Sequence, residues 1–174
     1  WDSQGFTRFW DVVADLDIPV FFTIGVVKDP EFDYLEELRR IGRWMERYPH
    51  VQTILTHGFA WRSFMKPDRI EVPDEVLDAI PIGNPNFYVQ LLFAVLLGGE
   101  YDYPMPQMRS TLKLLAERLG AEQLLWGTDI PMLLRHYTYR QSIDSFHMYC
   151  DFLSTKEMDL ILGGNMARIM KLDG

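Results

Sequence analysis

The stretch EQLLWGTDIPM, residues 122–132, indicates both the fold and the place of its chemistry. Three apolar residues at 124–126 lead through a glycine and a threonine to Asp129, and an isoleucine and a proline follow. A short, nearly continuous apolar run bounded by turn residues is typical of a strand buried on both faces, as in a parallel sheet. Such a strand would place Asp129 at its carboxyl end, where ligands bind in α/β proteins.

Three further apolar runs, at residues 18–25, 51–59 and 86–93, also have strand character. Helical periodicity predicts helices at residues 6–15, 34–48, 108–119, 139–152 and 156–162. Gly163 and Gly164 are expected to end the last of these, and Asn165 to cap a final helix over 166–172. Strands that alternate with helices predict parallel pairing through right-handed connections.

Two architectures accept this order of elements. One is an open doubly wound sheet, and the other is a (β/α)₈ TIM barrel, which typically needs about 250 residues and eight strands. The chain has 174 residues and four predicted strands. A barrel therefore requires that residues 1–174, taken as a single domain, supply its C-terminal part, roughly the last four βα units. Because the sequence begins with Trp1, we expect a processed product or a piece of a longer protein.

The spacing of the strands predicts that Thr23, His57, Phe93 and Asp129 lie near carboxyl ends of strands on one edge of the sheet. His57 and Asp129 could share a divalent metal, or one could bind the metal while the other moves protons. Each also has a purely structural interpretation, because a turn aspartate often accepts bonds from backbone amides and a histidine can donate to a carbonyl.

Residues 58–85, which follow the second strand, are the longest irregular stretch and could form a substrate loop. Arg62 in this loop could bind a substrate carboxylate, although loop arginines are commonly only exposed. The chain contains no glycine-rich nucleotide motif, serine-hydrolase motif, CxxC or HExxH. Redox, phosphoryl-transfer and serine-hydrolase functions therefore have no local support.

Composition excludes other classes of partner. The net charge is −8 without a basic cluster, which argues against nucleic acid and anionic membranes. No apolar run approaches the roughly 20 residues of a membrane span. Cys150 is the only cysteine, so no intrachain disulfide can form, and a reducing, cytoplasmic location fits.

Three segments, in order along the chain, resemble the amidohydrolase-related family typified by aminocarboxymuconate semialdehyde decarboxylase. VQTILTHGFAW (51–61) resembles the sixth barrel strand of that family, GAEQLLWGTDIPM (120–132) its final strand, and ILGGNMARIMKL (161–172) its closing helix. The resemblance implies a (β/α)₈ TIM barrel of which this chain is the second half.

The resemblance also implies a metal-dependent hydrolase or carbon–carbon lyase, such as a decarboxylase, that acts on a small carboxylated, often aromatic substrate. The implied cofactor is one divalent metal, zinc most commonly and manganese in some members. Carried over to this sequence, Asp129 would be a metal ligand and His57 the catalytic histidine that handles a proton. Arg62 is our candidate for binding the substrate carboxylate.

Two departures from the family pattern support other hypotheses. The His-x-His of the first barrel strand is absent, and Thr23 stands where the fifth strand should carry a ligand histidine. Because a threonine hydroxyl is a poor zinc ligand, a degenerate, metal-free barrel acting as a binding or scaffold protein is the alternative. A third hypothesis is an unrelated open α/β domain in which Asp129 is only a turn residue.

A half-barrel would have two open sheet edges and an exposed apolar interior. We therefore expect the chain to form a homo-oligomer or to associate with a missing N-terminal half.

Overall fold

Four parallel strands form the centre of the protein, in the spatial order β1–β2–β3–β4. The computed structural model describes residues 1–25 and 31–172. The strands are β1 (Val20–Thr23), β2 (Thr53–Thr56), β3 (Phe87–Leu91) and β4 (Leu124–Trp126). The four predicted strands and their parallel pairing are thus confirmed, and the fold is mixed α/β.

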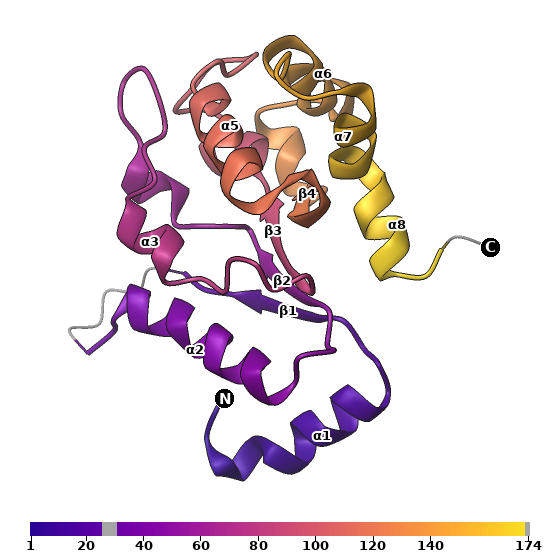
Figure 1. Ribbon diagram of the computed structural model, residues 1–174. Helices are drawn as coiled ribbons and strands as arrows, with labels where there is room; N and C mark the ends of the chain where they lie inside the picture. Colours follow the sequence, from indigo (N-terminus) through magenta and orange to yellow (C-terminus); the bar gives the residue numbers. More distant parts are fainter. Residues whose placement is uncertain (26–30, 173–174) are drawn as a thin grey trace.

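Helices precede, connect and follow the strands. They are α1 (Thr7–Asp15), α2 (Tyr34–Arg47), α3 (Asp74–Asp78), α4 (Phe93–Leu97), α5 (Met108–Leu119), α6 (Tyr139–Tyr149), α7 (Thr155–Asp159) and α8 (Asn165–Ile169). In Figure 1, α1 and α2 lie on the β1 side of the sheet, whereas α5 to α8 gather around β4. Of these, α4 was not expected, because its apolar residues continue those of β3 and the sequence predicts one strand through Phe93.

The side chains of the strands alternate between two faces. Phe22 on β1 packs against Trp44 of α2, with ring centroids 5.2 Å apart, on the face that carries the main core. The opposite face holds a smaller buried cluster of Ile54, Tyr88 and Leu125, which Ile169 of α8 covers. Phe21 lies on this second face of the edge strand, and it is 46% exposed.

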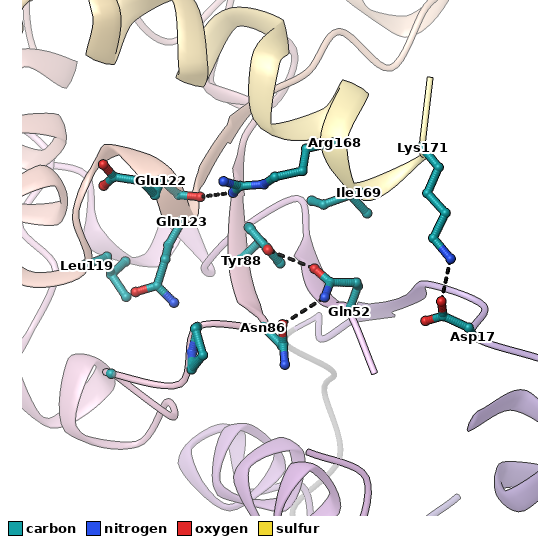
Figure 2. A pocket seen from close by; sticks show the side chains of 12 residues that line it. Asp17, Gln52, Asn86, Tyr88, Leu119, Glu122, Gln123, Arg168, Ile169 and Lys171 are labelled. Atoms are coloured by element: carbon teal, nitrogen blue, oxygen red, sulfur yellow. Dashed lines mark hydrogen bonds and ion pairs between the residues drawn. The ribbon is translucent and has the colours of Figure 1, made fainter. Parts of the chain in front are cut away.

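The amino ends of the strands surround a polar pocket of about 590 Å³, which Figure 2 shows. Tyr88 donates its hydroxyl proton to Gln52 Oε1 at 2.7 Å, and Gln52 Nε2 donates to Asn86 Oδ1 at 2.7 Å. Lys171 and Asp17 form an ion pair beside them. The polar groups at this end of the sheet bond mainly to one another, so the pocket is a structural junction between α8 and the strand starts.

The C-terminal helices differ from the sequence prediction. Gly163 and Gly164 do not end a helix, because a π-helical turn at Leu160–Gly164 joins α7 to α8. Asn165 does not cap α8 with its side chain. Instead its Nδ2 donates to the carbonyl oxygens of Ala121 and Leu124, at 2.8 and 2.9 Å, and the residue is fully buried. The asparagine therefore fastens α8 to the start of β4.

None of the helices in residues 1–25 and 31–172 is long and apolar enough to cross a membrane.

Candidate functional site

The carboxyl ends of β2 and β4 bring His57 and Asp129 together. Each residue lies in the turn that follows its strand, and His57 Nε2 is 3.8 Å from Asp129 Oδ2. Their side chains are 38% and 45% exposed, so both remain accessible to a small molecule. The predicted proximity of the two groups is observed, whereas their chemical roles stay predictions.

Both residues have a backbone conformation that is unusual for residues with a side chain. The φ angle is 63° at His57 and 48° at Asp129, in the left-handed region. Trp61, which is almost fully buried, donates from Nε1 to the carbonyl oxygen of His57 at 2.7 Å. A buried indole therefore fixes one backbone group of the strained residue.

The next position, Gly58, has no room for a side chain. Its φ is 67°, and a Cβ atom would lie 2.6 Å from Trp61 Cζ2 and 2.7 Å from the carbonyl oxygen of Gln90. The turn after β2 is thus packed tightly between an indole ring and the neighbouring strand.

Gln90 on β3 lies between the strands that lead to His57 and Asp129. Its Oε1 accepts hydrogen bonds from Thr56 Oγ1 at 2.7 Å and from the backbone N–H of His57 at 3.4 Å. On the other side, its Nε2 is 2.6 Å from where a Cβ on Gly127 would be. Gln90 was not among the residues predicted from the sequence. The signal was a polar residue inside an otherwise apolar strand, near its carboxyl end.

A pocket of about 360 Å³ opens beside His57. Thr23, His57, Trp61 and Arg62 line it together with apolar and backbone surface. Arg62 is exposed, and its Nε donates to the carbonyl oxygen of Leu96 at 2.9 Å. This bond anchors the guanidinium group at the rim of the pocket. The three predicted residues Thr23, His57 and Arg62 therefore share one cavity.

The loop that forms the pocket wall is held by Tyr34 of α2. The Tyr34 hydroxyl accepts a hydrogen bond from the backbone N–H of Ala60 at 3.0 Å. Burial raises the pKa of Tyr34 to about 12, so the phenol stays protonated at neutral pH. Tyr34 is a neutral support for the loop and not a proton carrier.

The donors at this site suit a divalent metal in type but are too few. An imidazole nitrogen and a carboxylate oxygen are ordinary ligands for zinc, and catalytic zinc sites typically take three protein ligands. Across residues 1–25 and 31–172, no group of three or more His, Cys, Asp or Glu side chains is arranged to hold an ion. Thr23 adds only a neutral hydroxyl, so these residues alone do not make a metal site.

Other residues after β4 belong to the packing and not to this pocket. His136 lies against Gly98 and Gly99, where an added Cβ atom would be 2.6 Å from the His136 Cβ atom and 2.8 Å from its Cε1 atom, respectively. Tyr137 is buried, and its hydroxyl donates to the carbonyl oxygen of Tyr101 at 3.4 Å. These contacts indicate that both residues support the packing of the chain.

A family model described as "Amidohydrolase" matches residues 1–172. The chain belongs to the amidohydrolase family. The resemblance to the amidohydrolase-related family is therefore confirmed. No curated protein sequence matches the chain.

Solved structures with a similar fold include other amidohydrolases and TIM-barrel proteins. A zinc-bound amidohydrolase from Burkholderia multivorans is 18% identical with a TM-score of 0.67, and the match covers 98% of this chain and 58% of that one. A dihydroxybenzoic acid decarboxylase from Polaromonas sp. JS666, solved with manganese and the inhibitor 2-nitroresorcinol, is 17% identical with a TM-score of 0.62 and coverages of 99% and 55%.

An uncharacterised TIM-barrel protein from Bordetella bronchiseptica is 19% identical, with a TM-score of 0.62 and coverages of 98% and 51%. This chain thus spans little more than half the length of the structures that it matches. The likeness shows the fold, and two of these structures contain a bound metal ion, manganese in one and zinc in the other.

Proposed function

We propose that this chain forms the C-terminal half, roughly the last four βα units, of a (β/α)₈ barrel with metal-dependent decarboxylase activity on a small aromatic carboxylate. The observation that carries the proposal is the pairing of His57 with Asp129 at 3.8 Å beside an open pocket. Family membership supports an enzyme of the amidohydrolase type. Structures similar to this chain include decarboxylases of dihydroxybenzoates, which supports lyase chemistry over hydrolysis.

We assign the role of metal ligand to Asp129, and the remaining ligands to the other half of the barrel. This division follows from the shortage of donors among the described residues. When bound, the ion would supply charge stabilisation to a substrate oxygen. Zinc is the first candidate and manganese the second, because both occur in similar structures.

Arg62 would bind the carboxylate of the substrate, since a guanidinium group presents paired donors that match the two oxygens. His57 would carry the proton, because an imidazole nitrogen can both accept and donate a proton. As the bond between ring and carboxyl carbon breaks, carbon dioxide leaves and the electron pair remains on the ring carbon. Protonated His57 would then donate its proton to that carbon.

The test uses the full-length protein and 2,6-dihydroxybenzoate as a probe substrate. We expect metal to co-purify and carbon dioxide to be released. His57→Ala should abolish turnover, and Arg62→Met should mainly raise KM. Arg69→Met is the matched control, because Arg69 pairs with Asp68 and Glu71 and does not line the pocket. Full activity of His57→Ala would overturn the proposed role of the imidazole.

The second candidate is a metal-free barrel that acts as a binding or scaffold protein. Thr23 favours it, because the threonine occupies the position expected for a ligand histidine and lines the pocket. In that case the full-length protein would contain no metal and would not turn over the probe after zinc or manganese is added. Binding of the probe to such a protein, measured by calorimetry, would establish this second function.

We also propose that a second copy or the missing N-terminal half covers the open side of the sheet. Strands β1 and β4 are both edges, and Phe21 on β1 is substantially exposed. Unpaired strand edges invite further pairing. In sizing experiments the 174-residue chain alone should therefore elute as a dimer or larger species, and a stable monomer would contradict the proposal.

A further inference from the structure

We propose that Gln90 is a positioning residue that sets the distance between His57 and Asp129. The inference rests on the proposed function, because it concerns how that reactive pair is held. Gln90 occupies β3, the strand between those that lead to the two residues. The oxygen of its side-chain amide faces the turn after β2, and the nitrogen faces the turn after β4. One planar amide therefore contacts both turns that carry the reactive pair.

The oxygen end of the amide fixes the histidine. Thr56 and the backbone N–H of His57 both donate to Gln90 Oε1, at 2.7 and 3.4 Å. Trp61 donates to the carbonyl oxygen of the same His57 at 2.7 Å. Both backbone polar groups of His57 are therefore held by side chains of other elements. Such support is needed because a left-handed conformation is unfavourable for a residue with a Cβ atom.

The nitrogen end of the amide faces the aspartate turn. With Oε1 held by Thr56, the planarity of the amide directs Nε2 toward Gly127, two residues before Asp129. The two are packed so closely that a Cβ on Gly127 would lie 2.6 Å from Nε2 and 3.1 Å from Cδ. A rotation of Gln90 would thus disturb the turn after β4 as well as the turn after β2.

Gln90 acts through its neighbours and not on the substrate. It is not among the residues that line the pocket beside His57. Loss of its amide should therefore affect the alignment of the reacting groups, and not the binding of the substrate. Misplacement of a catalytic group by about 1 Å can cost roughly a hundredfold in rate.

The experiment compares Gln90→Met with Gln52→Met in the full-length protein. Gln52 is a suitable control because it is also hydrogen-bonded to side chains of the sheet, at the opposite end. With 2,6-dihydroxybenzoate, we expect Gln90→Met to lower kcat at least about tenfold and to leave KM within about threefold. Gln52→Met should leave kcat unchanged while lowering the melting temperature to a similar degree.

A second pair of variants tests the same amide without replacing it. Thr56→Val removes the donor that orients Gln90, whereas Thr56→Ser keeps a hydroxyl, so Thr56→Ser should retain markedly more activity than Thr56→Val. In a Gln90→Met background, Thr56→Val should cause no further loss, because residues that act as a unit are not additive. If Gln90→Met fails to fold, the comparison of Thr56→Val with Thr56→Ser still tests the positioning role of Gln90.

Crystal structures separate this inference from the proposed function. In Gln90→Met or Thr56→Val the distance between His57 Nε2 and Asp129 Oδ2 should differ from that in the unmodified protein, whether or not the probe is turned over. An unchanged distance would overturn the positioning role. If His57→Ala keeps full activity, or the probe is never turned over, the proposed function fails while the crystallographic result still stands.

Discussion

His57 and Asp129 share a left-handed backbone, with φ angles of 63° and 48°, and their side chains meet at 3.8 Å. Two strained turns, each following a different strand, thus bring an imidazole and a carboxylate close together. Strain of this kind persists when the surrounding structure determines it, and it concentrates at functional sites. The backbone conformation of both turns can therefore be tested by substitutions at the site.

Replacement of His57 by glycine should give a more stable protein than replacement by alanine. Both variants remove the imidazole, but only glycine adopts a φ of 63° without steric cost. We expect the free energy of unfolding of His57→Gly to exceed that of His57→Ala by about 1 kcal/mol. Urea denaturation of the two variants measures this difference in unfolding free energy. A more stable alanine variant would show that the left-handed turn is not retained.

Gly58→Ala should be strongly destabilising. The new Cβ would lie 2.6 Å from Trp61 Cζ2, next to the rigid backbone of β3. Gly83→Ala is the matched control, since Gly83 also has a positive φ, of 87°, but no atom of the described residues lies within 4 Å of the new Cβ atom. We expect a loss of roughly 2–4 kcal/mol for Gly58→Ala and about 1 kcal/mol for Gly83→Ala. Equal losses would rule out a steric cause.

Thr23→His should increase the affinity of the full-length protein for zinc. Thr23 and His57 line the same pocket, and an imidazole binds zinc far better than a hydroxyl. Isothermal titration calorimetry should show at least about tenfold tighter binding, in line with the weight of single ligands and their supports in metal sites. The gain should disappear in a Thr23→His, Asp129→Ala double variant. If it persists there, the ion binds elsewhere.

Asn165→Asp should destabilise the protein through the contact between α8 and β4. The Nδ2 atom that donates to Ala121 and Leu124 would become an oxygen facing two carbonyls, and Arg168 contacts only Oδ1. A loss of roughly 3 kcal/mol in unfolding free energy is expected for a buried charge without adequate partners. Asn84→Asp should be nearly neutral, because Asn84 Oδ1 serves there as an acceptor.

The free energy of unfolding should decrease in alkaline solution because of the buried thiol of Cys150. Burial raises the pKa of its thiol from 9.0 to about 12. Above pH 9 the unfolded chain releases the proton while the folded one keeps it, so the contribution of this group to stability declines between about pH 9 and 12. Between pH 8 and 10 the unmodified protein should lose up to roughly 1 kcal/mol more than Cys150→Ala. The prediction would be contradicted if the unfolding free energies of the unmodified protein and of Cys150→Ala changed equally with pH.

The sequence predicted the strands and the meeting of His57 with Asp129 because apolar runs and their spacing define a parallel sheet. It did not predict α4, whose residues are as apolar as the strand before it. It also missed the π-helical turn before Asn165, because two consecutive glycines indicate a helix end and only tertiary contacts reveal otherwise. Gln90 was missed for a similar reason, since its role depends on neighbours that are distant in sequence.

The polar junction at the amino ends of the strands lies across the sheet from the turns that hold His57 and Asp129. Its hydrogen bonds join Gln52, Asn86 and Tyr88 without involving any residue of the pocket beside His57. The hydrogen bonds of this junction and the two groups proposed for the chemistry therefore lie at opposite ends of the strands. During evolution the turns could acquire a different substrate preference through loop substitutions alone, while the junction continued to hold the scaffold.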